Sequence, residues 1–422
     1  MAEFVLKGNI IYSEDAETLK LVEHGYLVCE DGISKGVFET LPETYATASL
    51  TDFGDMVILP GLSDLHMHAP QYAMRSNGMD MELLDWLETY TFPVESRYEQ
   101  LDYANAAYGR LVEDIRKSAT TRACIFGTIH NQATLLLMEM LETAGVRGYV
   151  GKVNMDRNSP DYLREESAKA SIEATRSWLT KCIHLNNIKP ILTPRFIPSC
   201  SDELMYALGK LQEETGIPVQ SHLSENYEEI AWVKELCPES ENYGDAYDRF
   251  GLFGTNGKTI MAHCVHSSEE EIERMKERGV FIAHCAQSNT NLSSGVAPAR
   301  VYLERGMKIG LGSDIAGGYT LSIFRAMADS IQSSKLRWRL LDDSFAPLSI
   351  EEAFYMGTVG GGEFFGKVGS FAEGYEFDAV IIDDSRLLPP HTLTLRERLE
   401  RIIYLSDDRE IVGKYVAGEK LF

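Results

Sequence analysis

Apolar residues in the central part of the chain come in short, strand-like runs, separated by longer stretches with helical spacing. The stretch SEEEIERMKERG at 268–279 is charged on one side and ends at Gly279, a typical helix stop signal. Eight strand–helix units in succession predict an α/β fold with a TIM-like (β/α)₈ barrel of parallel strands. The eight runs are VILPGLSDLHMH, ATTRACIFGTI, RGYVGKVNMD, IKPILTPRF, IPVQSHLSEN, KTIMAHCVH, VFIAHCAQSN and KIGLGSDIAGG.

An open, doubly wound sheet is the alternative arrangement of alternating strands and helices. The glycine-rich motifs GxGxxG and GxxxxGK[ST], which bind phosphates in such sheets, do not follow any of the predicted strands. The three glycines at 360–362 come after a helical stretch, and we predict a turn there. The barrel is therefore the favoured architecture.

Both ends of the chain consist of short β-like runs with turn punctuation, such as FVLKGNIIYS near the start and EFDAVIIDD near the end. Neither end alone is large enough to bury a core of its own. We therefore expect residues 1–58 and 370–422 to pair in a small composite β-sandwich domain, beside a barrel at 59–369.

The formal net charge of the 422-residue chain is −24, and 44% of its residues are hydrophobic. This charge repels nucleic-acid backbones and anionic membranes, and the basic patch of a nucleic-acid-binding protein is missing. No apolar run is long enough to span a membrane, and the N-terminus lacks the basic and apolar regions of a signal peptide. A small molecule is therefore the expected partner.

Seven cysteines are scattered along the chain without a CxxC motif. An odd count without paired spacing predicts reduced, mostly buried thiols rather than a disulfide framework. With the missing signal peptide, this predicts a cytoplasmic protein. Cys264 and Cys285 each follow a histidine directly, and alternation along a strand turns them away from the face of that histidine. We predict that both are core thiols.

Titratable side chains gather where the predicted strands end, which is where barrel enzymes carry their active sites. His66 and His68 lie two positions apart in the first run, so both point to the same side of the strand. Two imidazoles on one face are a start for a Zn²⁺ or Fe²⁺ site. Because burying unpaired titratable groups is costly, their joint occurrence favours a functional site. The other members are His222, Glu225, His263 and Asp314.

Several motifs resemble those of the amidohydrolase superfamily, in its purine and pyrimidine deaminase branch. The general likeness covers essentially the whole predicted barrel and lies in PGLSDLHMH, SHLSEN, AHC, AHCAQSN and GLGSDIAGG. Further segments resemble the members of this branch that act on guanine: HMHAPQY, LLDWLETYTFPVESRY, FGTIH, VGKVNMD, ILTPRFIPSCS and SDIAGGYTLSI. The resemblance implies a zinc-dependent hydrolase of purine catabolism that deaminates guanine to xanthine and ammonia, and a homodimer.

The resemblance also implies roles for individual residues. His263 matches the position that hydrogen-bonds the attacking water, Glu225 matches the proton-shuttling acid, and Asp314 can accept the proton that the water loses. One Zn²⁺ per chain, with Fe²⁺ as the alternative metal, would be bound by His66, His68, His222 and Asp314. The residues that match purine-binding positions are Gln71, Arg195 and Phe196.

The chain departs from the family's pattern at one position. The seventh-strand motif of the family is HCPxSN, and here Ala286 stands in place of the proline. We expect this change to loosen the loop without removing a polar group. The sequence leaves the roles of His130, His284 and Asn289 open.

Discrimination between purines can be predicted from donor and acceptor patterns. Arg195 is a donor only, so it can hold the exocyclic oxygen of guanine and disfavours the amine that adenine carries there. Gln71 offers both a donor and an acceptor, and Phe196 offers a ring face for stacking. The aromatic residues of LLDWLETYTFPVE are typical of helix packing, and because this segment follows the first strand it is also a candidate wall of the pocket.

Two other functions stay open at this point. The first is a deaminase or hydrolase of another amino-heterocycle, such as a nucleoside, a pterin or a triazine, which a substrate screen would separate. The second is a non-catalytic barrel that serves as a scaffold. A scaffold would predict missing metal ligands, whereas the whole predicted set is present.

Overall fold

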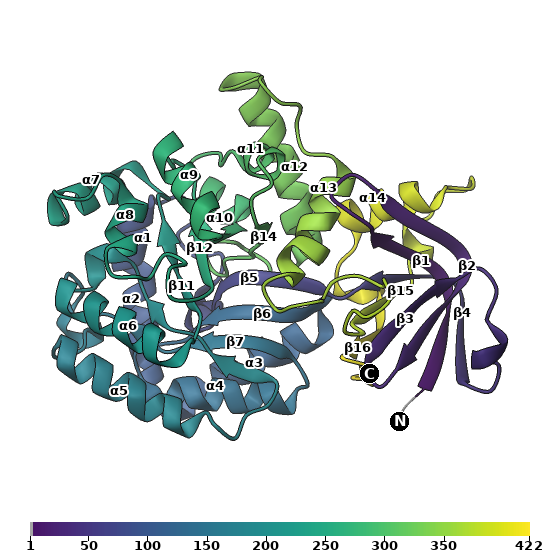
Figure 1. The fold of residues 1–422 in the computed structure, drawn as a ribbon, viewed down its shortest axis with the longest axis horizontal. Coiled ribbons are helices and arrows are strands. Elements are labelled where there is room, and N and C mark those ends of the chain that lie inside the picture. Colours follow the sequence, from purple (N-terminus) through teal and green to yellow (C-terminus); the bar gives the residue numbers. More distant parts are fainter. Residues whose placement is uncertain (1–2) are drawn as a thin grey trace.

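Parallel strands and the helices around them form the larger part of the molecule. The computed structural model describes residues 3–422, and Figure 1 shows this part beside a second, strand-rich part. Two four-stranded sheets contain only parallel pairs, in the orders β5-β6-β7-β9 and β11-β12-β13-β14, and β8 pairs with β10 in parallel. These strands are β5 Leu62–His68, β6 Thr120–Phe126, β7 Arg147–Gly151, β8 Val153–Asn154, β9 Ile188–Pro190, β10 Thr193–Pro194, β11 Val219–Leu223, β12 Thr259–His263, β13 Phe281–His284 and β14 Ile309–Leu311.

Each of the eight predicted runs contains a strand of these parallel sheets, so the predicted α/β class is confirmed. The two four-stranded sheets also approach each other at both edges. Leu192, just after β9, forms a parallel bridge with Val219 of β11. At the other edge, the Asp314 N–H beyond β14 donates to the His66 carbonyl of β5 at 2.8 Å. Because the two sheets meet at both edges, the strand ends that carry the predicted site residues lie on the same side of the parallel strands.

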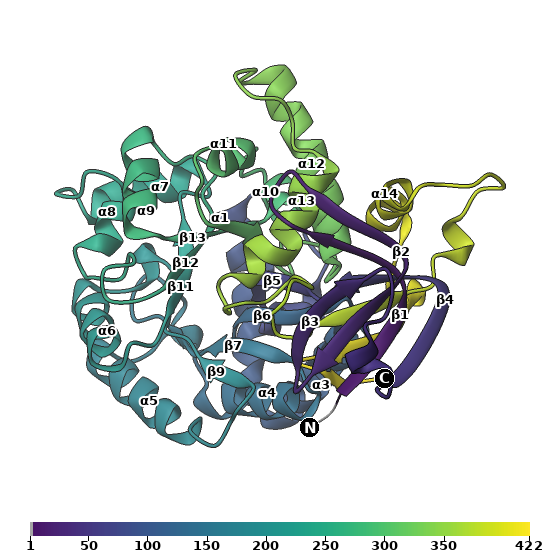
Figure 2. The same cartoon turned by 45° about the vertical axis from the view of Figure 1, so that its right-hand side comes forward.

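Helices follow the parallel strands and lie outside them, as the helices α4, α5 and α6 show in Figure 2. The longer helices are α3 Leu101–Lys117, α4 Asn131–Thr143, α5 Ala168–Lys181, α6 Asp202–Thr215, α7 Tyr227–Leu236, α9 Glu269–Arg278, α12 Ile323–Leu340 and α14 Leu395–Leu405. The shorter α-helices are α1 Leu83–Trp86, α2 Phe92–Glu95, α8 Tyr243–Asp248, α10 Ala286–Asn291, α11 Ala299–Glu304 and α13 Ile350–Tyr355. The 3₁₀ and π segments are η1 Glu43–Tyr45, η2 Ala69–Met74, η3 Leu87–Thr91, η4 Ser96–Glu99, η5 Asp161–Leu163, η6 Ile197–Ser199, η7 Met356–Gly360, η8 Ser385–Leu387 and η9 Asp408–Glu410.

Two local predictions about helices have different outcomes. Helix α9 ends at Gly279 with a φ of 64°, as predicted, because glycine adopts this left-handed cap without steric cost. The predicted turn at 360–362 is wrong, since these three glycines continue the helical segment that begins with α13. Their physical role is close packing: a Cβ added at Gly361 would lie 2.9 Å from the Ser63 Cβ of β5.

The two chain ends share one seven-stranded sheet, in the order β17-β16-β15-β4-β1-β2-β3. Residues 57–60 of the first predicted run belong to this sheet, and the parallel strand β5 begins only after Gly61. The composite origin of the sheet matches the expectation, whereas its sandwich form and the domain limits stay predictions. The strands are β1 Glu3–Ser13, β2 Leu19–Glu30, β3 Ile33–Phe38, β4 Ser49–Pro60, β15 Ala379–Ile382, β16 Ile411–Val416 and β17 Glu419–Lys420.

A buried ion pair connects the parallel strands to the C-terminal segment. Arg122 of β6 donates from Nε and Nη2 to the two carboxylate oxygens of Asp378, at 2.6 and 2.9 Å, and from Nη2 to Glu376 at 2.9 Å. The Asp378 side chain also accepts from the Ala417 N–H at 2.7 Å. Since Arg122 and Asp378 are buried, each depends on the other to offset the cost of its desolvation.

We expect the substitution Asp378→Ala to lower the free energy of unfolding by about 3–5 kcal/mol, because it leaves a buried guanidinium without its main partner. Urea unfolding of both proteins at one metal concentration measures this. Asp52→Ala, which breaks an exposed pair with Lys7, is the matched control and is expected to have a much smaller effect. Equal losses in the two variants would contradict the account of this ion pair.

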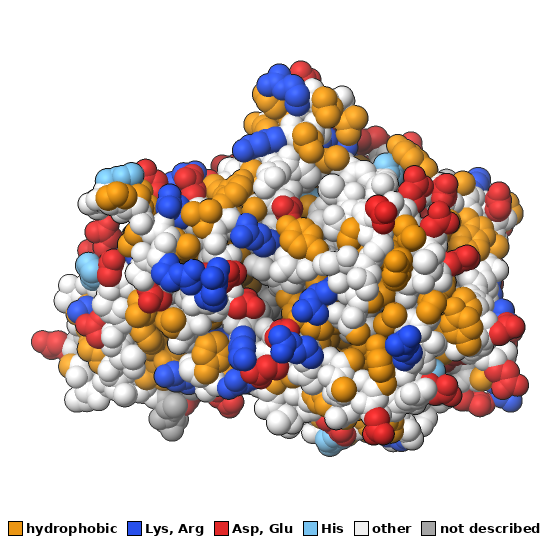
Figure 3. Space-filling model, turned by 180° about the vertical axis from the view of Figure 1, so that it is seen from behind, with side chains coloured by type: hydrophobic (Ala, Val, Ile, Leu, Met, Phe, Trp, Pro, Cys, Tyr) orange, Lys and Arg blue, Asp and Glu red, His pale blue; other side chains and the backbone are white. Residues whose placement is uncertain are grey.

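The described cysteines are all free and buried, which confirms the prediction of reduced core thiols. Within residues 3–422, no helix is both long and apolar enough to cross a bilayer. At the end of α12, Leu336, Leu340 and Leu341 are more than half exposed. They lie where α12 projects from the body, and the view from behind in Figure 3 shows hydrophobic side chains gathered on this projection.

Candidate active site

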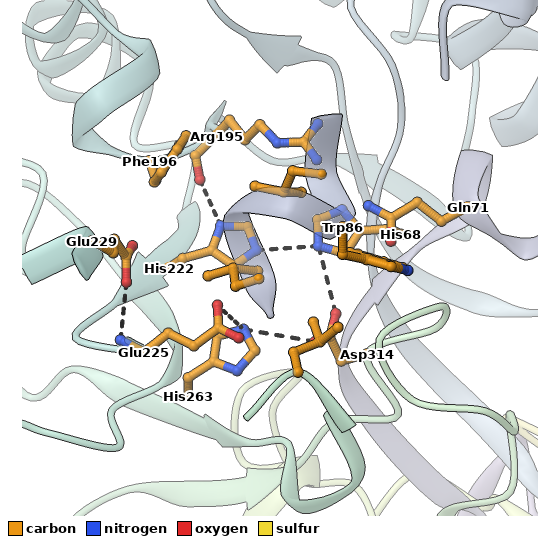
Figure 4. A pocket seen from close by; sticks show the side chains of 13 residues that line it. His68, Gln71, Trp86, Arg195, Phe196, His222, Glu225, Glu229, His263 and Asp314 are labelled. Carbon is orange, nitrogen blue, oxygen red and sulfur yellow. Dashed lines mark hydrogen bonds and ion pairs between the residues drawn. The ribbon is translucent and has the colours of Figure 1, made fainter. Parts of the chain in front are cut away.

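Four side chains from three strand ends converge on one point. Asp314 Oδ1 lies 3.2 Å from His66 Nε2 and 3.6 Å from His68 Nε2, and His68 Nε2 lies 3.1 Å from His222 Nε2. The structure thus brings together all four predicted metal ligands. Figure 4 shows His68, His222 and Asp314 pointing toward one another. The remaining nitrogen of His222, Nδ1, is held by the Arg195 carbonyl at 2.6 Å, which directs Nε2 to the centre.

The chemistry of this cluster fits a divalent cation. His66 is fully buried; its Nδ1 has no hydrogen-bond partner among the described residues, and its Nε2 faces Asp314 Oδ1 at 3.2 Å. Burial lowers the pKa of His66, and it lowers the pKa of His68 and His222 further, which favours neutral imidazoles. Burial alone would raise the pKa of Asp314, but interactions with His66 and the nearby imidazoles hold it well below its usual range. Neutral imidazoles and an ionised carboxylate are the donor set that zinc prefers.

Glu225 and His263, the two other predicted catalytic residues, lie beside this cluster. His263 Nε2 is 3.4 Å from Glu225 Oε2 and 3.7 Å from Asp314 Oδ2. Glu225 Oε1 accepts from the Ser294 hydroxyl at 3.0 Å. Burial raises the pKa of Glu225, partly offset by His263, so its protonated form is stabilised. A carboxyl group that readily holds a proton next to this cluster of candidate metal ligands is suited to proton transfer.

Asn289 has a position that the sequence did not predict. Its Oδ1 accepts from His263 Nδ1 at 2.8 Å, which orients the His263 ring and leaves Nε2 facing the cluster. Asn289 lies in α10, whose first residue is Ala286. The segment that begins at Ala286 is thus a short helix rather than an irregular loop, and whether alanine loosens it stays a prediction. His284, the other residue left open, is buried and its pKa is lowered to about 4 by burial and by His263, so it is neutral.

The backbone is strained at three strand ends of the site. Ser224, His263 and Asp314 have positive φ angles of 46°, 73° and 45°, in the left-handed region that non-glycine residues rarely adopt. Such strain persists only where the surrounding structure imposes it, and it is frequent at active sites. Here it falls where β11, β12 and β14 end, at the pocket-lining residues His263 and Asp314 and directly before the pocket-lining Glu225.

The predicted substrate-binding residues line the same pocket as the candidate metal ligands His68, His222 and Asp314. Gln71, Arg195 and Phe196 lie on its wall, and Phe196 also packs edge-on against Trp232. Residues of the aromatic segment after β5 line it too, which confirms that part of the expectation. The full lining is His68, Gln71, Leu83, Trp86, Leu87, Arg195, Phe196, His222, Glu225, Glu229, His263, Leu292 and Asp314.

Two buried carboxylates near the pocket were missed by the sequence reasoning. Glu95 accepts hydrogen bonds from Arg195 and from Gln71. Glu229 accepts from the Glu225 N–H at 3.1 Å, and burial next to Glu225 raises the pKa of Glu229 to about 7. For Glu95, the available signal is a charged residue directly after the apolar residues of TFPVE. For Glu229, it is the Asn–x–x–Glu capping box at the start of α7.

The structure also places Cys285, predicted to be a core thiol, and His130, whose role the sequence leaves open. Cys285 is buried, and burial raises the pKa of its thiol well above the usual value, so the neutral thiol is favoured although Sγ lies near Asp314 and His263. This agrees with a core thiol. His130 precedes α4 and does not line the pocket.

Comparison with known proteins places the chain among close relatives. Residues 57–421 match the sequence profile of the amidohydrolase family. A guanine deaminase of Dictyostelium discoideum is 40% identical over 443 residues, covering 99% of this chain and 98% of its own. The crystal structure of guanine deaminase from C. acetobutylicum with bound guanine in the active site is 49% identical and covers 100% of both chains, with a TM-score of 0.97. The E. coli guanine deaminase structure is 32% identical, with 99% of both chains covered and a TM-score of 0.89.

Proposed function

The chain belongs to the amidohydrolase family, and from this premise we infer that it is a hydrolase that converts guanine and water to xanthine and ammonia. The observation that carries this inference is the convergence, in one pocket, of a metal-binding cluster, a protonatable Glu225 and the donor side chains of Arg195 and Gln71. The similarity to guanine deaminases over the whole chain supports the same substrate. A non-catalytic scaffold would need none of these groups.

We further propose that the two parallel sheets close a (β/α)₈ barrel of eight strands. The bridge at Leu192 and the hydrogen bond at Asp314 support this closure, because they join the edges of the two sheets. In this proposal the barrel spans 59–369. We likewise propose a composite β-sandwich domain from 1–58 and 370–422, which is supported by the strands that both chain ends contribute to the seven-stranded sheet.

The proposed metal is one Zn²⁺ per chain, with Fe²⁺ as the alternative. When bound, the cation lowers the pKa of a water molecule towards neutrality and so supplies a nucleophile. The approach of His66 Nε2 to Asp314 Oδ1 and the opposed nitrogens of His68 and His222 support a cation at this point. The residues that would bind it are His66, His68, His222 and Asp314.

Side chains of the protein then carry out the proton transfers. Asp314 directs Oδ1 to His66 and Oδ2 to His263, so Oδ2 is placed to accept a proton from the attacking water. Glu225 protonates the ring nitrogen next to C2, which avoids a build-up of negative charge on the ring. The resulting carboxylate then takes the proton of the new C2 hydroxyl and passes it to the leaving amine, and the proton that Asp314 accepted from the water returns Glu225 to its acid form. His263 is held by Asn289 and orients the water for attack on C2. Collapse of the tetrahedral intermediate releases ammonia.

Recognition of the purine is assigned to three residues of the pocket wall. Arg195 binds the exocyclic oxygen of guanine, Gln71 binds a neighbouring acceptor, and Phe196 packs against the ring. We also propose that the enzyme is cytoplasmic, takes part in purine metabolism and acts as a homodimer. The exposed leucines at the end of α12 support assembly, since apolar surface of this kind favours burial.

A substrate screen tests the proposed function. Ammonia release is measured for the purified, metal-replete protein with guanine, adenine, cytosine and a pterin. We expect turnover of guanine and much slower turnover of adenine and cytosine, because neither combines an amine at the reacting carbon with an oxygen acceptor opposite Arg195. A pterin shares this amino-oxo ring with guanine but carries a larger, six-membered second ring, so its slower turnover would reflect the shape of the pocket. Turnover of a different ring with no activity on guanine would contradict the assignment of the substrate and leave the metal site intact.

A second prediction concerns the orientation of His263. We expect Asn289→Ala to lower kcat for guanine by about 10–100-fold, since it removes the acceptor that orients His263. Thr290→Ala changes an exposed neighbour in the same helix and is the control. Steady-state kinetics of the two variants measures the difference. A kcat in Asn289→Ala equal to that of Thr290→Ala would show that His263 needs no orientation.

A further inference from the structure

A buried carboxylate, Glu95 of α2, holds together the two polar side chains that face the substrate. Arg195 Nη1 donates to Glu95 Oε2 at 2.6 Å and Arg195 Nη2 donates to Glu95 Oε1 at 3.2 Å. Gln71 Nε2 donates to the same Oε1 at 3.0 Å. Glu95 is only 2% exposed and does not itself line the pocket. It therefore acts on a ligand through Arg195 and Gln71.

The amide of Gln71 has one orientation in this network. Its Oε1 accepts from the Ala316 N–H at 3.2 Å, while its Nε2 donates to Glu95. A flipped amide would set its oxygen against the Glu95 carboxylate and its NH₂ against the Ala316 N–H, and both contacts are repulsive. The group that Gln71 can offer to a ligand is therefore the second N–H of Nε2. This narrows the sequence-based expectation that Gln71 serves as donor and acceptor alike.

Arg195, too, can offer only N–H donors to a ligand. A guanidinium has no acceptor, and the N–H groups that Glu95 leaves unused remain available as donors. The Phe92 ring lies 5.2 Å from the guanidinium carbon and limits its orientation further. Both side chains thus present N–H groups to the pocket. A wall of donors accepts an oxygen or a bare ring nitrogen and rejects an amine at the same position.

We propose that Glu95 is the positioning residue that sets this donor-only wall, and thereby determines that the enzyme takes a purine with an oxygen, rather than an amine, opposite Arg195. This inference rests on the proposed function, because it assumes that the purine binds with its exocyclic oxygen towards Arg195 and Gln71. It adds a residue 100 positions from Arg195 in the chain to the determinants of substrate choice.

Two substrates isolate the effect. Guanine and 2,6-diaminopurine carry the same reacting amine at C2, and they differ at C6, where guanine has an oxygen and 2,6-diaminopurine has an amine. The ratio of kcat/KM for guanine to that for 2,6-diaminopurine therefore measures how strongly the wall prefers an acceptor. When this ratio is compared between a variant and the wild type, any effect of the variant on the chemical step that is common to both substrates cancels.

The experiment measures kcat and KM of both substrates for the wild type, Glu95→Gln, Glu95→Asp and the control Asp378→Asn. Asp378→Asn makes the matching change at another buried carboxylate paired with an arginine, away from the pocket. In Glu95→Gln, an NH₂ group replaces one of the two oxygens that accept from Arg195 and Gln71, so one of these N–H groups loses its acceptor. The Gln71 amide is then free to turn its oxygen towards the pocket. We expect KM for guanine to rise and the substrate ratio to fall by about 10–100-fold, with a smaller change in kcat.

The conservative variant and the wild type separate the possible outcomes. Glu95→Asp keeps the negative charge and is expected to retain a larger part of the ratio than Glu95→Gln, and it replaces Glu95→Gln in the test if the latter does not fold. The inference is overturned if a folded Glu95 variant keeps the wild-type substrate ratio and KM, or changes them only as much as Asp378→Asn does. In that case, guanine turnover by the wild type still upholds the proposed function. No guanine turnover by the wild type would overturn both.

Discussion

Replacing Glu225 with glutamine is expected to lower kcat for guanine by about 10²–10⁴-fold, with little change in the bound metal. The substitution keeps the shape of the side chain and removes the exchangeable proton. Glu225 is 3% exposed, accepts from Ser294, and faces His263 rather than the metal cluster directly. Because burial raises its pKa, the native side chain readily holds the proton that the ring nitrogen needs.

Steady-state kinetics and elemental analysis of the same preparation measure this effect. Glu228→Gln is the matched control, since Glu228 is an exposed carboxylate close by in α7 and its loss is expected to leave kcat unchanged. Retention of more than about a tenth of the wild-type kcat in Glu225→Gln would rule out the proton shuttle, because general acid–base catalysis contributes more than that.

The substitution His66→Ala is expected to remove both the metal and the activity. His66 lies at the centre of the cluster, and its Nε2 is 3.2 Å from Asp314 Oδ1. Without this ligand the site loses affinity for the cation, and guanine turnover falls to the background. The protein also loses the stabilisation that a bound metal gives to the folded state.

Elemental analysis, kinetics and thermal unfolding with and without added Zn²⁺ measure these losses. We expect about one metal ion per chain in the wild type, at least about tenfold less in His66→Ala, and a zinc-dependent rise in Tm only in the wild type. His184→Ala removes an exposed histidine and is the control. Full metal content with full activity in His66→Ala would contradict the proposed ligand set.

Much of the fold could be predicted because period and length are local properties. The eight strand runs, the stop of α9 at Gly279 and the β-like chain ends all follow from spacing and turn residues. The spacing of apolar residues does not show which other strand a segment pairs with. For this reason the apolar pattern predicts one run over 57–68, although residues 57–60 pair in the seven-stranded sheet. The glycines at 360–362 were misread because their reason is a close contact with Ser63, far away in the chain.

The site follows the same rule. His66 and His68 share a strand face, so alternation and position at a strand end predicted that they act together. His222, Glu225, His263 and Asp314 were predicted from their positions at other strand ends, and the structure brings them to one place. The second layer could not be predicted in this way. Glu95 reaches Arg195 only through tertiary packing, and the pairing of Asn289 with His263 joins two different strand–helix units.

The most direct test of the central claim is the conversion of guanine by the metal-replete wild-type protein in isotope-labelled water. Hydrolytic deamination predicts equal amounts of ammonia and xanthine, with the label at the new carbonyl oxygen on C2, because the attacking oxygen comes from solvent. No xanthine, or xanthine without the label, would contradict the assignment of this site as a hydrolytic guanine deaminase.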